Sequence, residues 1–122
     1  MGAYRGLALS KTKAVSDWED LVRSRGCIIT GQNDVQIHHP KGRKYKNQKI
    51  LIGCWWILPL NWDLHDVNSN DPLNVTHFHK KFTAKYGLQS DLFITMCDDI
   101  VLEGNVLPFS RDVIGSIRDT RK

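Results

Sequence analysis

The chain has no apolar run long enough to span a bilayer. The run CWWILPL at residues 54–60 is far too short, and the N-terminus lacks the apolar segment of a secretory signal peptide. Internal repeats and low-complexity tracts are also missing, and 122 residues suit a single domain. These absences lead us to expect a soluble cytoplasmic protein with no membrane partner.

Cysteine is scarce. The three cysteines, Cys27, Cys54 and Cys97, are odd in number and widely spaced, and no CxxC pair occurs. This pattern argues against a disulfide framework and excludes a four-cysteine structural zinc site. Cys97 falls at an apolar position of a predicted helix, which indicates a core residue.

Acidic residues are missing from the most basic segment. Residues 41–49 (KGRKYKNQK) hold five Lys or Arg and no acid, while the whole chain carries a net charge of +4. The first thirteen residues also contain Arg5, Lys11 and Lys13 without an acid. Such clustering favours a polyanionic partner, above all nucleic acid, although a merely solvated loop would show it too.

The N-terminal segment lacks apolar periodicity. We therefore assign residues 1–15 to a flexible basic arm and residues 16–122 to one domain. Ser16 and Glu19 form a capping-box pattern, which predicts a helix over about 16–25.

The remaining elements give an α+β class that is mostly helical. CIIT (27–30) and VQIHH (35–39) flank a turn-forming GQND and predict a β-hairpin, followed by an irregular loop over 40–50. Asp71 and Pro72 predict the start of a helix that ends at Gly87. Further helices are predicted at about 61–67, from Ser90 onward, and after Ser110.

All five histidines lie in one third of the chain: His38, His39, His65, His77 and His79. Imidazole is the commonest metal ligand in proteins, and it titrates near neutral pH, so it can also act as a base. A lone histidine is usually structural. A cluster at the edges of several elements indicates a metal or catalytic site.

The ordered motifs CIITG, VQIHHPKGR, WWILPLNWDLH, HFHKKFTAKYG and LF span about residues 27–100. This set resembles HNH endonucleases, and more specifically the phage Ref (recombination enhancement) nucleases. The resemblance implies a ββα-metal (His-Me finger) core and metal-dependent DNA hydrolysis. It also implies a place in the cytoplasm of a phage-infected or prophage-bearing bacterial cell.

The resemblance assigns a role to each histidine. His38 matches a metal ligand, His39 the general base, and His65 the metal ligand on the helix of the motif. His77 fits the remaining ligand best, with His79 as the alternative. If residues 72–86 form one helix, these last two side chains lie about 200° apart around it, so only one of them faces the ion.

The chain departs from the HNH pattern at two places. Thr30, Asn61 and Leu64 replace cysteines that bind a structural zinc in many relatives, so we expect no structural zinc. Trp56 stands where the central Asn of the motif would be. We expect Trp56 to hold the loop by packing, with its indole N–H as a possible donor.

The implied cofactor is one divalent metal ion. Mg²⁺ or Mn²⁺ would serve turnover, while mostly imidazole ligands favour tight binding of Zn²⁺ or Ni²⁺. The implied partner is DNA, held by phosphate contacts, and a recombinase filament is a further partner that the resemblance allows. A zinc-stabilised DNA-binding module without catalysis and a junction-selective resolvase remain alternatives. The expected DNA contacts are Lys41, Arg43, Lys44 and Lys46.

Overall fold

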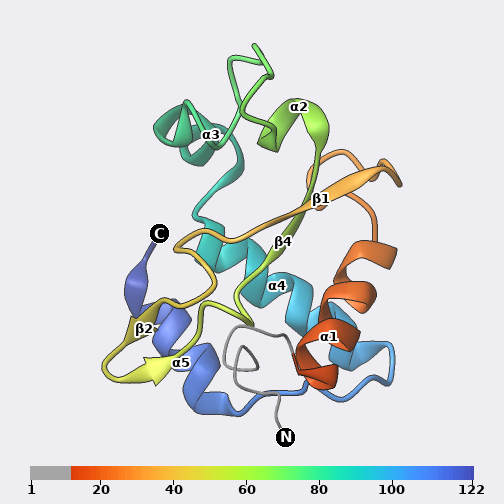
Figure 1. Cartoon of the computed structure of the whole chain (residues 1–122), viewed down its shortest axis with the longest axis vertical. Coiled ribbons are helices and arrows are strands. Elements are labelled where there is room, and N and C mark those ends of the chain that lie inside the picture. Colours follow the sequence, from red (N-terminus) through yellow and green to blue (C-terminus); the bar gives the residue numbers. More distant parts are fainter. Residues whose placement is uncertain (1–11) are drawn as a thin grey trace, which may run out of the picture.

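The computed structural model describes residues 12–122 and confirms the α+β class (Figure 1). About 43% of these residues are helical, and the described strands form two small antiparallel sheets. The elements are α1 (Lys13–Ser24), β1 (Val35–His38), β2 (Lys46–Asn47), β3 (Ile50–Leu51), β4 (Leu58–Asn61), α2 (Trp62–His65), α3 (His79–Tyr86), α4 (Gln89–Leu102) and α5 (Arg111–Thr120).

Helix α1 begins three residues earlier than the capping box predicts. The hydroxyl oxygen of Thr12 accepts a hydrogen bond from the backbone N–H of Val15 at 3.2 Å, so Thr12 is the N-cap and Ser16 lies inside the helix. Residues 13–15 of the predicted arm therefore belong to α1, whereas residues 1–11 lie outside the described part of the chain.

The predicted hairpin between residues 27–30 and 35–39 is wrong, because β1 pairs with a different strand. β1 pairs antiparallel with β4, with Val35 opposite Asn61 and His38 opposite Leu58. Residues 27–30 instead form a turn, closed by a hydrogen bond of 2.9 Å from Gly31 N–H to the carbonyl oxygen of Cys27. Gly31 takes a φ of +77°, a backbone conformation that glycine adopts without steric cost.

The turn at residues 27–30 still contacts the sheet. Ile28 N–H donates to the carbonyl oxygen of Pro59 in β4 at 2.9 Å. β4 is buried along its whole length, and α2 follows it without a gap. The described chain thus contains two antiparallel strands followed directly by a short helix (Figure 1).

The basic segment is more ordered than the predicted irregular loop. β2 and β3 form a hairpin whose two turn residues, Gln48 and Lys49, have φ values of 51° and 70°. Two consecutive left-handed residues are typical of the tight turns that join twisted strands. Gly53 lies directly against the backbone of this segment, because a Cβ at Gly53 would lie 2.1 Å from the carbonyl oxygen of Gly42.

The predicted helix over residues 72–86 is wrong in its first half. Only its second half is helical, and this helix, α3, begins at His79. The side-chain oxygen of Asn74 accepts hydrogen bonds from the backbone N–H groups of Thr76 and His77 at 2.8 and 3.1 Å. This local turn competes with helical hydrogen bonds, so His77 precedes the helix and the helix-face comparison with His79 does not apply.

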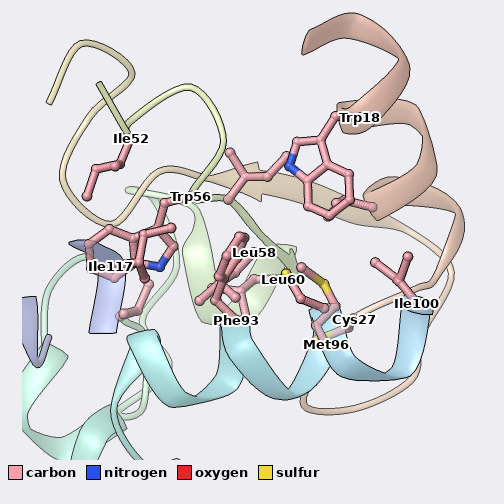
Figure 2. Packing of buried hydrophobic residues seen from close by; sticks show 14 of the residues in the cluster. Trp18, Cys27, Ile52, Trp56, Leu58, Leu60, Phe93, Met96, Ile100 and Ile117 are labelled. Carbon is pink, nitrogen blue, oxygen red and sulfur yellow. The ribbon is translucent and has the colours of Figure 1, made fainter. Parts of the chain in front are cut away.

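The helices α2, α4 and α5 are confirmed close to their predicted positions. Figure 2 shows Phe93 and Met96 of α4 beneath Leu58 and Leu60 of β4, and Ile100 of the same helix below Trp18. The periodic apolar face of α4 is therefore a core face. None of the helices in residues 12–122 combines the length and apolar character that a membrane crossing requires.

Two tryptophans complete this core. The indole N–H of one has a hydrogen-bond acceptor, and that of the other does not. Trp18 of α1 donates from Nε1 to the carbonyl oxygen of Trp55 at 2.8 Å. Trp56 is only 1% exposed, and its Nε1 has no hydrogen-bond partner among the described residues. Trp56 therefore stabilises its segment by packing alone. Leaving its indole N–H buried without an acceptor lowers the stability of the folded state.

Two glycine substitutions test the close approach at Gly53. We expect Gly53→Ala to lower the free energy of unfolding by about 3 kcal/mol or more, because the new methyl group would overlap backbone that must then shift. Gly115→Ala is the matched control. Gly115 lies inside α5, and nothing lies within 4 Å of the place that a Cβ would take there, so alanine should add about 0.5–1 kcal/mol. Urea denaturation measures both, and equal effects would contradict the close approach.

Candidate functional site

The pairing of β1 with β4 brings two predicted metal ligands together. His38 is the last residue of β1, and His65 is the last residue of α2, which follows β4. Their ring centroids lie 5.0 Å apart with the ring planes inclined at 65°. The start of α2 is fixed by Asn61, whose side-chain oxygen accepts the Leu64 N–H at 3.1 Å. We call His38 and His65, with Gln36 and Gln89, the imidazole cluster.

Hydrogen bonds to Gln36 orient the ring of His65. Nδ1 of His65 lies 2.6 Å from Oε1 of Gln36, and the amide nitrogen of Gln36 donates to the Asp66 carboxylate at 2.9 Å. A carboxylate can only accept, so the amide oxygen must face His65, whose Nδ1 must then carry the proton. The lone pair of His65 is therefore on Nε2.

The ring of His38 is held by Gln89 at the start of α4. Nε2 of His38 donates to Oε1 of Gln89 at 2.7 Å, across a sequence separation of 51 residues. The lone pair of His38 is consequently on Nδ1. Gln89 is fully buried, so this contact also joins α4 to the end of β1.

Burial keeps both rings uncharged at neutral pH. It lowers the pKa of His38 from 6.5 to about 4, against the hydrogen bond to Gln89, which favours the charged form. Burial also lowers the pKa of His65, although the nearby Asp66 carboxylate opposes the change. Only a neutral imidazole has a free lone pair, so both residues are in the form that binds a metal ion.

The other three predicted histidines lie outside these two elements or at their edges. His39 follows β1 directly, and its carbonyl oxygen accepts the Gly42 N–H at 3.2 Å. Nε2 of the exposed His77 donates to the carbonyl oxygen of Val67 at 2.7 Å, and His79 is the exposed first residue of α3. Within residues 12–122, no three His, Cys, Asp or Glu side chains are grouped closely enough to hold a metal ion.

The predicted DNA-contacting residues separate into different environments. The Arg43 guanidinium lies 3.7 Å from the buried carboxylate of Glu19, although its side chain is still 46% exposed. Nζ of Lys41 lies 5.4 Å from the centre of the Tyr45 ring. Lys44 and Lys46 are exposed, and Lys46 belongs to β2. The basic segment is thus partly tied to the domain.

Two of the four positions that the sequence resemblance matched to zinc cysteines have different roles here. Asn61 caps α2, and Leu64 lies in the core. Cys27 remains in the turn at residues 27–30. Burial acts to raise the pKa of its thiol, but hydrogen bonds from Thr30, Ile29 and Asn61 outweigh it and lower the pKa overall. These contacts account for Cys27 as a structural residue of the turn.

Sequence reasoning missed both glutamines of the imidazole cluster. A signal existed for Gln36, because residues two apart on a strand share a face and Gln36 precedes His38 by two positions. Nothing local pointed to Gln89, whose contact with His38 depends on how α4 packs.

No family model, curated protein or solved structure matches this chain. A function for the imidazole cluster therefore rests on the chemistry of its own side chains and on the sequence motifs. That chemistry is a pair of neutral imidazoles, each fixed in orientation by a buried or half-buried glutamine.

The buried imidazoles predict a pH dependence of stability for the metal-free protein. The unfolded state takes up protons near pH 6.5, whereas His38 in the folded state does so only near pH 4, so acid favours unfolding between these values. For His38 alone, we expect the free energy of unfolding to fall by about 2 kcal/mol from pH 7.5 to pH 5.

Urea denaturation in the presence of EDTA, repeated across this pH range, measures the effect. His38→Gln keeps an amide donor for Gln89 but cannot titrate, so its stability should depend less on pH. His79→Gln changes an exposed ring outside the cluster and should behave as wild type. If the free energy of unfolding falls equally with pH in wild type and in His38→Gln, His38 is not buried in its neutral form.

Proposed function

We propose that this protein is a metal-dependent DNA endonuclease with a ββα-metal core, related to the phage Ref nucleases. The observation that carries the proposal is the contact between His38 and His65, whose ring centroids lie 5.0 Å apart although they come from β1 and α2. The order of two antiparallel strands and a helix supports the same reading.

The imidazole cluster offers two ligands to the proposed divalent metal ion, and a further ligand would have to join them. His38 and His65 are neutral, and their glutamine partners leave one lone pair on each ring. Partners of this kind orient metal-bound histidines and make them better ligands. His77 is the proposed further ligand and His79 the alternative, and two or three imidazoles suit Mn²⁺, Zn²⁺ or Ni²⁺, with Mg²⁺ possible in turnover. When bound, the ion supplies positive charge at the scissile phosphate and at the leaving oxygen.

His39 is the proposed general base. Adjacent residues at the end of a strand point to opposite sides, so His39 does not share the side of His38. In its neutral form, His39 takes a proton from a water molecule, whose oxygen forms a bond to phosphorus. The bond from phosphorus to the 3′ oxygen breaks, which leaves a 5′ phosphate and a 3′ hydroxyl.

The basic segment is proposed to hold the DNA backbone. Lys41, Lys44 and Lys46 carry charges that can contact phosphates, and the order of the β2–β3 hairpin limits the positions that Lys46 samples. Arg43 is the proposed contact near the scissile phosphate, because its planar guanidinium suits two phosphate oxygens. It would share its charge between the DNA and Glu19, which lies 3.7 Å away.

A pair of neighbouring substitutions tests the division of labour. We expect His39→Ala to keep metal binding and lose cleavage by ~10²–10⁴-fold, the usual contribution of a general base. His38→Ala should lose both metal binding and cleavage. Metal-dependent nicking of supercoiled plasmid measures activity, and calorimetric titration with Mn²⁺ measures binding.

Absence of nicking by the wild-type protein with any of Mg²⁺, Mn²⁺, Zn²⁺ or Ni²⁺ would favour a DNA-binding module without catalysis. Full activity of His39→Ala would reject His39 as the base. Branched and linear DNA, compared side by side, would reveal a junction-selective resolvase.

The glutamine contact gives an independent test of the metal site. Gln36→Leu removes the acceptor that orients His65, so we expect metal affinity to fall by about 10–100-fold. Asn33→Leu is the control, since it changes an exposed amide just before β1. Calorimetric titration with Zn²⁺ measures both variants. Unchanged affinity in Gln36→Leu would mean that His65 is not a ligand.

A further inference from the structure

A second concentration of positive charge lies beside the imidazole cluster. It is a pocket of about 530 Å³ between the start of α3, the end of α5 and the segment that follows β1. Figure 1 shows the C-terminal end of the chain beside this segment and the connection from α3 to α4. We call it the cationic pocket; it is lined by Lys41, His79, Lys80, Thr83, Ala84, Leu88, Thr120, Arg121 and Lys122.

The lining of the cationic pocket is unbalanced in charge. Four of its side chains are Lys or Arg, and no Asp or Glu is among the lining residues. Within the described part of the chain, Lys80, Arg121 and Lys122 form no ion pair. Burial is the main cause that lowers the pKa of Lys122, and repulsion by the nearby charge of Lys41 adds to it. An anion bound here would relieve that repulsion.

One hydrogen bond and one sequence neighbour connect the cationic pocket with the imidazole cluster. The backbone N–H of Ser90 donates to a main-chain oxygen of Lys122, the last residue of the chain, at 2.6 Å, and the preceding residue, Gln89, holds His38. On the other side, Lys41 follows His39 by two positions. The pocket and the proposed catalytic residues therefore share the start of α4 and the end of β1.

We infer that the cationic pocket binds an internal phosphodiester group of the DNA strand, close to the bond that is cut. The inference rests on the proposed function, because it takes DNA as the ligand. Lysine and arginine side chains from three separate segments provide the donors that phosphate oxygens accept. His79 also lines this pocket, within reach of the phosphate that we place there.

The test uses a double variant, Lys80→Gln with Arg121→Gln, which removes two pocket charges and keeps side-chain length. The matched control is Lys85→Gln with Arg111→Gln, which removes two exposed charges outside the pocket. Fluorescence anisotropy in EDTA measures binding of a labelled duplex at several salt concentrations, so no strand is cut. We expect the salt slope to fall by about 0.9 in the pocket variant and to stay at the wild-type value in the control.

Two further measurements distinguish an internal phosphodiester from a terminal phosphate. They also distinguish failure of the pocket proposal from failure of the nuclease proposal. The pocket variant should weaken binding equally for duplexes with 5′-phosphate and 5′-hydroxyl ends. A loss confined to 5′-phosphorylated DNA, or equal slopes for pocket and control variants, would overturn the inference. Titration with inorganic phosphate should shift the amide resonances of Thr83, Leu88 and Arg121 in the wild type but not in the pocket variant, and unshifted wild-type resonances would also overturn it. Pocket-dependent DNA binding without any nicking would reject the nuclease and keep the phosphate site.

Discussion

The pairing of β1 with β4 is the constraint on which the rest of this structure depends. Only four residue pairs form it, from Val35 opposite Asn61 to His38 opposite Leu58. This register fixes where β1 ends, and the continuous backbone from β4 into α2 fixes where His65 lies. A shift by one residue would turn His38 to the opposite face, away from His65 and Gln89. Burial of all four β4 residues opposes such a shift.

The elements with a clear period or cap were predictable from sequence. The apolar face of α4, the position of α2 and the start of α5 were predicted from local patterns, and each is present. The family resemblance, and not local patterns, assigned His38 and His65 to one site, and their ring centroids lie 5.0 Å apart. Local patterns failed where a side chain took over backbone hydrogen bonds, as Asn74 does ahead of α3.

Contacts between segments that are distant in the sequence could not be predicted from local patterns. Residues 27–30 (CIIT) have a high strand propensity, whereas β4 (LPLN) contains Pro59 and Asn61, which strands disfavour, so propensity alone selects the wrong partner for β1. Burial of β4 against α4 decides between them, and that is a property of the assembled core (Figure 2). Gln89 and the residues of the cationic pocket depend on the same packing, which brings the start of α4, the end of α5 and Lys41 together.

The close approach at Gly53 has a consequence for association kinetics and thermodynamics. Its backbone lies against Gly42 and Arg43, so the basic segment at residues 41–49 packs directly on the folded domain. The conformational entropy of ordering that segment is lost during folding and not at the moment a polyanion arrives. A ligand that meets this surface therefore finds much of the backbone already in place, and chiefly the lysine side chains remain to be ordered.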